Sequence, residues 1–264
     1  MRAFSRRRFR GAGNGTDDNS GDDSGVHMSE EYGVRSLHIG SSMVQSAMRL
    51  ATPNHLELTY TRCMMGFALF HPRPENVLMI GLGGGSLAKF VYHRLPQVQT
   101  TVIEINPQIV AMAREHFFVP ADDDRLQVVI AEGGEFVASH PDSADIIMVD
   151  GFDDGRQVPS LCSQGFYDHA LEALNSNGVL VVNLLSRDRA VHDYLHRIED
   201  SFGGRVATLL AEPFGNLIVF AFEQSLGKAA WERENLQERA KQLEQELALP
   251  FTRFVKKLQQ RSPF

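Results

Sequence analysis

The stretch NVLMIGLGGGSLAKFVYHRL, residues 76–95, contains a short apolar run, a glycine-rich turn and a segment with the apolar spacing of a helix. An apolar run bounded by turn residues predicts a buried strand. Gly83 and Gly85 would let the backbone of the turn approach a ligand closely, because glycine has no Cβ. Since ligands bind beyond the carboxyl ends of the strands in open parallel sheets, we expect a binding site at this turn.

The alternation of apolar strand and helix continues on the carboxyl side of this stretch. Further strands are predicted in QTTVIEIN (99–106), LQVVIAEGGEFV (126–137), ADIIMVDGF (144–152), VLVVNLLS (179–186) and NLIVFAF (216–222). Helices are predicted between them, and the one over residues 107–117 has Pro107 at its start, where proline is favoured. This order predicts an α/β fold with a mostly parallel sheet that is covered by helices on both faces.

Acidic side chains end three of these strands: Glu104 the second, Glu132 the third and Asp150 the fourth. One acid at a strand end is typically a helix cap or a solvated loop residue. A glycine turn and three acids at successive strand ends of one sheet indicate a ligand site. Glu104 is placed to accept hydrogen bonds from ribose hydroxyls.

The glycine turn separates two classes of nucleotide ligand. GLGGGS supplies Gly81, Gly83, Gly84 and Gly85, but Ser86 stands where the dinucleotide fingerprint GxGxxG has its last glycine. The acid in AEGGEF has no standard role in the dinucleotide fold, whereas AdoMet-type folds commonly carry one there, near the adenine amino group. The sequence therefore predicts a Rossmann-like fold of the AdoMet-methyltransferase type with an adenosyl-sulfonium ligand.

The composition of the 264-residue chain argues against several other classes. A net charge of −7 does not suit a nucleic-acid partner, which favours a basic stripe. Cys63 and Cys162 lie in unrelated contexts and the histidines are scattered, so neither a disulfide framework nor a metal site is expected. This cysteine usage points to the reducing cytoplasm. We expect no membrane partner, because no apolar run approaches the roughly 20 residues of a membrane-spanning helix.

Composition also divides the chain into four predicted segments. These are a disordered tail (1–30), an N-terminal hairpin and helix element (31–74), a Rossmann-like AdoMet-type catalytic domain (75–224) and a C-terminal helical extension (225–264). The tail is rich in Arg, Gly, Asp and Ser and has almost nothing to bury. A helix is expected over residues 56–70 and ordered structure from about Val34 onward.

The chain resembles the polyamine aminopropyltransferases, of which spermidine synthase is the best-known member. The likeness runs from about Leu37 to about Phe222. It rests on VLMIGLGGGSL, VIEINPQIV, RLQVVIAEGGEFV, DIIMVDGFDD followed by GFY, and NGVLVVNL. The resemblance implies transfer of the aminopropyl group of decarboxylated AdoMet to putrescine or a longer amine, with release of methylthioadenosine.

The resemblance also implies roles for individual residues. Glu104 takes the ribose role and Glu132 stands where the family has its adenine-side Asp, and the glycine turn and Gly133 also bind the donor. Asp150 and Asp153 match the two acids of the family's fourth-strand motif. Two tyrosines match tyrosines of the family: Tyr60, which joins the two aspartates as a catalytic residue, and Tyr167, which joins Asp153 in binding the amine.

The glycine turn departs from the family pattern, which usually reads GGGDGG and places its Asp toward the aminopropyl amine of the donor. Two alternatives therefore stay open: an AdoMet-dependent methyltransferase, and a non-catalytic protein that binds a nucleoside or a polyamine. The expected partners are small molecules, a polyamine and an adenosyl-sulfonium. Decarboxylated AdoMet or AdoMet is expected as a co-substrate, with no permanently bound cofactor and no metal. A homodimer is expected.

The attack of an amine on a sulfonium carbon explains why a carboxylate is expected at Asp150. An amine that attacks a sulfonium carbon must be neutral, yet with a pKa of about 10.4 only about one molecule in 10³ is neutral at pH 7, an obstacle of about 4–5 kcal/mol. Asp150 can accept the proton as the bond forms. Asp153 can hold the amine in line with the carbon. For Asp154 we favour the structural interpretation, a cap on a following helix.

Overall fold

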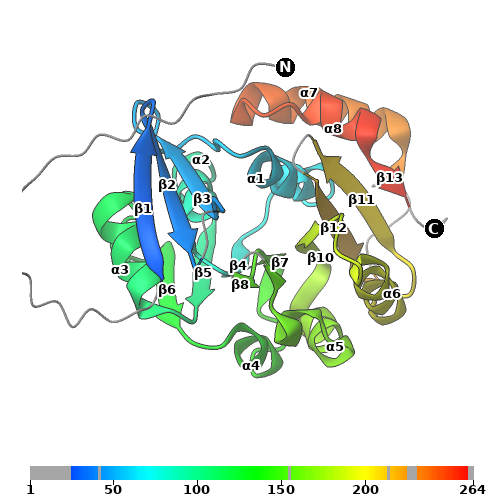
Figure 1. Ribbon diagram of the computed structural model, residues 1–264. Helices are drawn as coiled ribbons and strands as arrows, with labels where there is room; N and C mark the ends of the chain where they lie inside the picture. Colours follow the sequence, from blue (N-terminus) through cyan, green and yellow to red (C-terminus); the bar gives the residue numbers. More distant parts are fainter. Residues whose placement is uncertain (1–24, 41–42, 154–155, 213–214, 225–230, 261–264) are drawn as a thin grey trace, which may run out of the picture.

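An eight-stranded sheet forms the centre of the protein (Figure 1). The computed structural model describes residues 25–40, 43–153, 156–212, 215–224 and 231–260. The strand order is β13-β11-β12-β10-β7-β4-β5-β6, and the five strands from β10 to β6 run parallel to one another. Strand β12 is antiparallel to β10 and β11, and β13 is antiparallel to β11. The prediction of a mostly parallel sheet is confirmed.

The parallel strands follow the predicted apolar runs. They are β4 (Asn76–Ile80), β5 (Gln99–Glu104), β6 (Leu126–Ile130), β7 (Ala144–Val149) and β10 (Leu174–Leu185). The antiparallel end of the sheet contains β11 (Val206–Ala211), β12 (Asn216–Phe222) and β13 (Gln259–Gln260). The run 126–137 does not form one strand, because β6 ends at Ile130 and a short helix begins at Gly133. Strands β11 and β13 were not predicted.

Both faces of the central strands are buried, which explains their nearly continuous apolar sequences. Val77 and Met79 of β4 belong to one hydrophobic core, and Leu78 and Ile80 belong to another on the opposite face. One core contains helices α1 (Thr59–Met64), α2 (Ser86–Arg94), α3 (Pro107–His116), α7 (Arg233–Leu247) and α8 (Phe251–Lys257). The other contains α4 (Gly133–Ala138), α5 (Gln164–Ala173) and α6 (Val191–Ser201), at the bottom of Figure 1.

A small antiparallel sheet precedes the central one. It consists of β1 (Val26–Glu31), β2 (Val34–Ile39) and β3 (Ser46–Arg49), where a single hairpin from Val34 onward was predicted. The prediction of a disordered tail to residue 30 is therefore wrong for residues 26–30, which pair with β2. Alternation is hard to see in VHMSEE because most of its side chains are exposed. The rest of the predicted tail, residues 1–24, lies outside the described residues.

The helix predicted over residues 56–70 is divided. It consists of α1 followed by a 3₁₀ segment, η1 (Met65–Leu69), whose residues are buried. The predicted C-terminal extension contains two helices, and Leu236, Leu243 and Leu247 of α7 are buried in the core that η1 also lines. Helix α7 therefore packs on its own domain.

A short ribbon follows β7 and carries the chain toward α5. It consists of β8 (Phe152–Asp153) and β9 (Arg156–Gln157), and the 3₁₀ turn η2 (Pro159–Cys162) comes after it.

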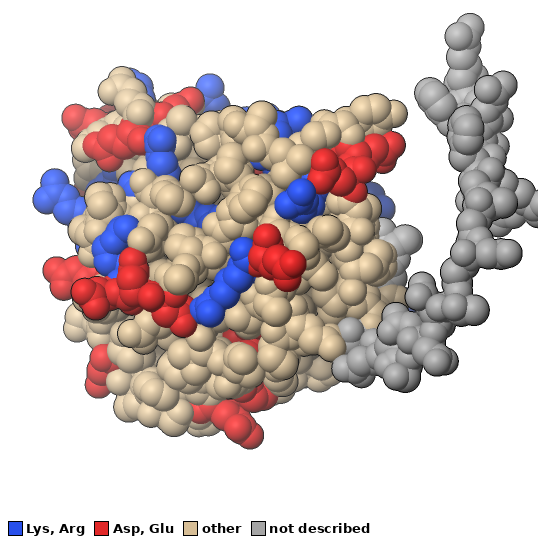
Figure 2. Space-filling model, turned by 90° about the vertical axis from the view of Figure 1, so that its left-hand side faces the viewer, with Lys and Arg blue, Asp and Glu red and all other residues tan. Residues whose placement is uncertain are grey.

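Charges of both signs are mixed on one face of the protein. On the face that Figure 2 shows, Lys and Arg side chains are interspersed with Asp and Glu instead of forming a basic stripe. Within the described parts of the chain, no helix combines the length and the apolar character needed to cross a bilayer.

Candidate active site

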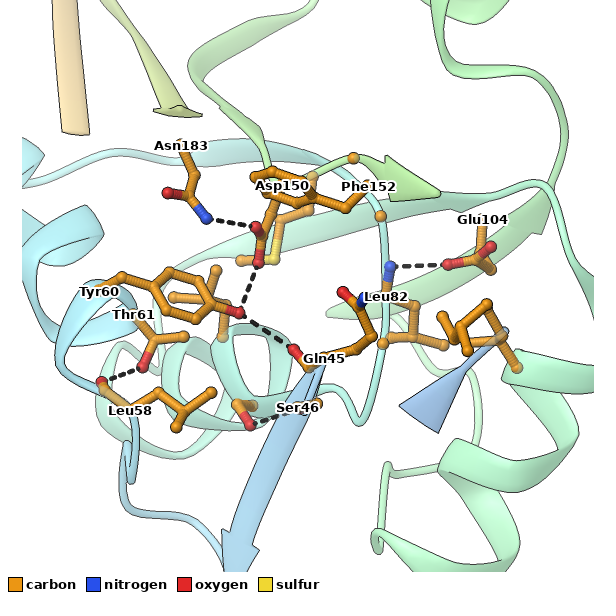
Figure 3. A pocket seen from close by; sticks show the side chains of 18 of the residues that line it. Gln45, Ser46, Leu58, Tyr60, Thr61, Leu82, Glu104, Asp150, Phe152 and Asn183 are labelled. Atoms are coloured by element: carbon orange, nitrogen blue, oxygen red, sulfur yellow. Dashed lines mark hydrogen bonds between the residues drawn. The ribbon is translucent and has the colours of Figure 1, made fainter. Parts of the chain in front are cut away.

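A cavity of about 770 Å³ lies at the carboxyl end of the parallel strands. The residues that follow β4, β5, β6 and β7 line it, together with residues of β2, β3, α1 and β10. The figure shows side chains from these separate elements converging on one space (Figure 3). The cavity therefore lies where the sequence predicted a ligand site, and its lining includes parts of the small N-terminal sheet that were not predicted to contribute.

The glycine turn packs against the end of β7. Gly81 has a φ of 95°, and a Cβ built there would lie 2.5 Å from the carbonyl oxygen of Asp150. Gly85 is the N-cap that precedes α2 and has a φ of 66°, and a Cβ built there would lie 2.2 Å from Cγ2 of Val119. Only glycine suits these two positions, because a side chain would be strained and would clash. Of the four predicted glycines, Gly81 and Gly83 line the cavity, while Gly84 and Gly85 are absent from its described lining.

Glu104 ends β5 and is buried. Its carboxylate accepts the main-chain N–H of Leu82 at 2.9 Å and that of Asn106 at 3.0 Å. Glu104 thus ties the glycine turn to the loop after β5. Each carboxylate oxygen has a second acceptor position, so the side chain can still receive hydrogen bonds from a ligand in the cavity that it lines.

Glu132 caps α4 in the structure. Its Oε2 accepts the main-chain N–H of Glu135 at 2.7 Å, and its Oε1 accepts the hydroxyl of Ser160 at 3.2 Å. Glu132 and Gly133 both line the cavity. Gly133 leaves no space for a larger residue, since a Cβ would lie 2.5 Å from Cγ2 of Ile80. Capping and ligand binding remain compatible, because the Glu132 side chain borders both the helix and the cavity.

Asp150 is the centre of a hydrogen-bonded cluster (Figure 3). Its Oδ2 accepts the hydroxyl of Tyr60 at 3.1 Å, and its Oδ1 accepts Nδ2 of Asn183 at 2.8 Å. Burial raises the pKa of Asp150, and the two hydrogen bonds act in the opposite direction. Burial, and then the neighbouring Asp150, raise the pKa of Tyr60 well above its ordinary value. Tyr60 therefore stays a neutral hydrogen-bond donor beside a carboxylate that can accept a proton.

The structure does not bring every predicted residue to this cavity. Tyr167 of α5 is fully buried in the core beneath the sheet and is absent from the cavity lining. Asp153 follows Asp150 in β8, and its main chain pairs with Arg156. The side chain of Asp153, and the whole of Asp154, lie outside the described residues.

Sequence reasoning missed three residues around Asp150: Gln45, Asn183 and Asn216. The carbonyl of Gln45 is 3.4 Å from the Tyr60 hydroxyl, and Nδ2 of Asn216 donates to Oδ1 of Asn183 at 3.0 Å. One signal was available for Asn183, because it is the only polar residue in VLVVNLL (179–185). A buried polar side chain in such a run has to be hydrogen-bonded.

The charge of the lining is one-sided. Four carboxylates line the cavity, those of Glu57, Glu104, Glu132 and Asp150, and the described lining residues include no Lys, Arg or His. Arg49, which is outside the lining, pairs with Glu57 at 2.5 Å and neutralises one of the four. The remaining lining is largely apolar. Such a cavity suits a cationic ligand with an apolar body.

The described residues contain no cluster of three or more His, Cys, Asp or Glu side chains placed to hold a metal ion.

Known proteins are similar to this chain in sequence and in architecture. Residues 57–235 match the spermine/spermidine synthase domain. The chain is 41% identical to a polyamine aminopropyltransferase of Chromobacterium violaceum over 235 residues, which is 89% of each chain. It is 37% identical to a polyamine aminopropyltransferase of Neisseria meningitidis over 239 residues, which is 90% of each chain.

Solved structures confirm the Rossmann-like fold of the AdoMet-methyltransferase type. A probable spermidine synthase from Corynebacterium glutamicum aligns with a TM-score of 0.68 at 20% identity, covering 81% of this chain and 83% of the other. Human methyltransferase-like protein 13, in complex with SAH, aligns with a TM-score of 0.62 at 28% identity, covering 72% and 92%.

Proposed function

The chain belongs to the spermine/spermidine synthase family, and we propose that it transfers the aminopropyl group of decarboxylated AdoMet to a diamine such as putrescine. The relatives described above are polyamine aminopropyltransferases. One observation supports this choice of donor. The described residues of the cavity lining include four acids and no basic side chain. Decarboxylated AdoMet is a sulfonium with an amine and no carboxylate, whereas AdoMet would bring its carboxylate into an acidic cavity.

The reaction is a displacement at the carbon bonded to the sulfonium sulfur. The lone pair of the acceptor nitrogen forms the new C–N bond, the C–S bond breaks, and its electron pair goes to sulfur to give methylthioadenosine. The attacking nitrogen carries an extra proton after bond formation. Asp150 accepts that proton through the acceptor positions that Tyr60 and Asn183 leave free.

The other predicted residues have supporting roles in this proposal. Glu104 accepts the ribose hydroxyls of the donor, and Gly81 and Gly83 let the donor approach the backbone of the turn. Glu132 and Gly133 border the adenine side of the cavity. Asp153, which follows Asp150 by three residues, aims the amine. The role of Asp153 depends on the resemblance, and the other roles depend on the resemblance and on the position of each residue around the cavity.

Methyl transfer from AdoMet is the second candidate, because human methyltransferase-like protein 13, whose solved structure contains SAH, shares the fold at 28% identity. The two candidates differ in the carboxylate of the donor. The acidic cavity favours the donor that lacks it.

Binding and product formation should be measured together. Calorimetry with methylthioadenosine, decarboxylated AdoMet and AdoMet gives the three affinities, and mass spectrometry follows the products with putrescine as acceptor. We expect decarboxylated AdoMet to bind more tightly than AdoMet and spermidine to appear. Tighter binding of AdoMet, or a methylated product without an aminopropylated amine, would overturn the proposal. Binding with no product from any donor would favour the non-catalytic alternative.

A cytoplasmic homodimer is also proposed. Cys63 and Cys162 are buried and free, as expected of a protein in a reducing compartment, which supports the cytoplasmic location. Light scattering after size-exclusion chromatography measures the oligomeric state directly.

A further inference from the structure

Asn183 is a buried amide in an apolar strand. It lies near the carboxyl end of β10, is 1% exposed, and is surrounded in sequence by Val and Leu residues that are themselves buried. A buried amide costs free energy unless its polar atoms are paired. The presence of a buried amide at a strand end that borders the cavity therefore has to be explained by its hydrogen bonds.

Each polar group of Asn183 has a partner. Nδ2 donates to Oδ1 of Asp150 at 2.8 Å, and Oδ1 accepts Nδ2 of Asn216 at 3.0 Å. The main-chain carbonyl accepts Nε2 of Gln157 at 2.9 Å. Asn183 is therefore held from β12 and from β9, while its amide is directed at Asp150 (Figure 3).

We propose that Asn183 is a positioning residue that orients the carboxylate of Asp150 and keeps it ionised for proton transfer from the amine. This inference rests on the proposed function of the cavity. Asn183 and Tyr60 each occupy one acceptor position, on Oδ1 and on Oδ2 respectively. Together they fix the plane of the carboxylate, and one acceptor position on each oxygen stays available to the substrate.

The surrounding charges make this donor important. The titratable group in contact with Asp150 is Tyr60, and the other ionisable groups that line the cavity are Glu57, Glu104 and Glu132. Arg49 pairs with Glu57 from outside the lining, and the described lining has no Lys, Arg or His that could stabilise the charge of Asp150. Neutral hydrogen bonds therefore stabilise the charged form, in opposition to burial, which raises the pKa of Asp150.

The chain contains a matched control on the same two strands. Nδ2 of Asn175, also on β10, donates to Oδ1 of Asp145 on β7 at 2.8 Å. The two pairs have the same chemistry and the same distance, but Asn175 and Asp145 are absent from the cavity lining. A change at Asn175 therefore tests what loss of an Asn–Asp bond between these strands does away from the cavity.

The experiment compares the wild type with Asn183→Leu, Asn183→Asp and Asn175→Leu. Leucine removes the donor at similar volume, and aspartate replaces it with a like charge. We expect Asn183→Leu to lower kcat about 10- to 100-fold, on the scale of impaired general base catalysis, with the Kd for methylthioadenosine within about twofold of the wild type. The acid limb of the kcat–pH profile should move to higher pH in Asn183→Leu and further in Asn183→Asp. Asn175→Leu should leave kcat and the acid limb unchanged.

A second measurement reports on Asp150 without catalysis. ¹³C NMR of the Asp carboxyl groups, assigned through Asp150→Asn, should show Asp150 titrating at higher pH in Asn183→Leu and unchanged in Asn175→Leu. An unchanged titration and acid limb in folded Asn183→Leu would overturn the inference. Absence of an aminopropylated product from the wild type would overturn the proposed function, and the NMR titration would still show whether Asn183 controls Asp150.

Discussion

Two Asn–Asp pairs join β7 and β10, one at each end of the strands. Asn175 donates to Asp145 at the amino end of β7, and Asn183 donates to Asp150 just beyond its carboxyl end, both at 2.8 Å. The side chains are chemically the same, yet the pKa of Asp145 is lowered and that of Asp150 is raised. Strand pairing and residue type therefore do not decide how these two carboxylates behave.

The difference lies in how deeply each carboxylate is buried and in how many donors surround it, because Asp150 is buried more deeply than Asp145 and has fewer donors. Burial opposes the ionisation of Asp145, but hydrogen bonds from Asn175 and from the main-chain N–H groups of Asn76 and Glu75 outweigh it. In the described part of the chain, the carboxylate of Asp150 accepts side-chain hydrogen bonds from Asn183 and Tyr60, and these two do not offset its burial. A carboxylate well supplied with donors holds strands together, whereas one with fewer donors in a cavity is available to accept a proton.

The largest expected effect is on turnover. Asp150→Asn removes the proton acceptor and should reduce kcat by about 10²-fold or more, the scale of a lost general base. Affinity for methylthioadenosine should stay nearly unchanged, because the nucleoside depends on Glu104 and Glu132 in the proposal. Turnover in a putrescine assay with decarboxylated AdoMet, followed by mass, measures the first quantity, and calorimetry measures the second.

Asp145→Asn is the control for this comparison. It changes the same functional group on the same strand and should leave kcat per folded molecule within about twofold, as expected for a residue outside the site. If Asp150→Asn keeps wild-type turnover, or if Asp145→Asn loses it to the same extent, the distinction between the two ends of the strands is wrong.

The sequence predicted the positions of the carboxylates better than their surroundings. Glu104, Glu132 and Asp150 each follow an apolar run, and the ends of neighbouring parallel strands must meet at one edge, so their convergence could be anticipated. Asn216 could not be placed near Asp150 in this way, because β12 is antiparallel and its register with β10 is a tertiary feature. Asn183 lies near the end of β10, which is parallel to β7, and was missed although it is the lone polar residue of its apolar run. Tyr167 was assigned to the amine by resemblance alone, and the helical face that carries it packs into the core.

Similar reasons explain the errors in the fold. Strand β1 has the sequence VHMSEE, with little apolar alternation, and forms because β2 offers an edge to pair with. Helix α1 gives way to η1 where every residue from Met65 to Leu69 is buried, so packing outweighs the helical pattern there. Local periodicity cannot report either effect, since both depend on residues distant in sequence.

Glu104 shares one feature with each of the two aspartates. Like Asp145, it accepts hydrogen bonds from main-chain N–H groups, and like Asp150, it lines the cavity. Glu104→Gln keeps the shape but weakens charge-assisted hydrogen bonds, which are worth about 1.5–3 kcal/mol each. Affinity for methylthioadenosine should fall at least about tenfold, as measured by calorimetry. Glu132→Gln serves as the matched variant and should lose less, since Glu132 already caps α4. Unchanged affinity in folded Glu104→Gln would place the ribose elsewhere.

The next effect concerns stability at the amino end of the strands. Asp145→Ala leaves three donors without their acceptor and should lower the free energy of unfolding by about 1–2 kcal/mol at pH 7, since water replaces part of the loss. A lowered pKa in the folded state means that the stabilisation is present above the unfolded value of about 3.9 and is lost as pH falls through the folded value. Urea unfolding at pH 7 and at lower pH should therefore show the difference from wild type shrinking on acidification. A difference that grows instead would contradict the assignment of Asp145.

The smallest effect has the opposite sign and tests the comparison most directly. The raised pKa of Asp150 means that folding favours its protonated form, so its favourable contribution is present below about pH 3.9 and is lost as pH rises through the folded value. At pH 7 the wild type carries the cost of a buried carboxylate that Asp150→Asn lacks. The amide oxygen of the variant can still accept the hydrogen bond from Asn183, and its NH₂ group can donate to the Tyr60 oxygen. The Tyr60 hydroxyl can then donate to the carbonyl of Gln45.

We expect Asp150→Asn to raise the free energy of unfolding by about 0.5–1 kcal/mol at pH 7, a typical gain on removing a functional compromise, and by less as pH falls. Urea unfolding at matched pH values measures this change beside Asp145→Ala, and a loss of stability in Asp150→Asn at pH 7 would show that both aspartates serve the fold alike.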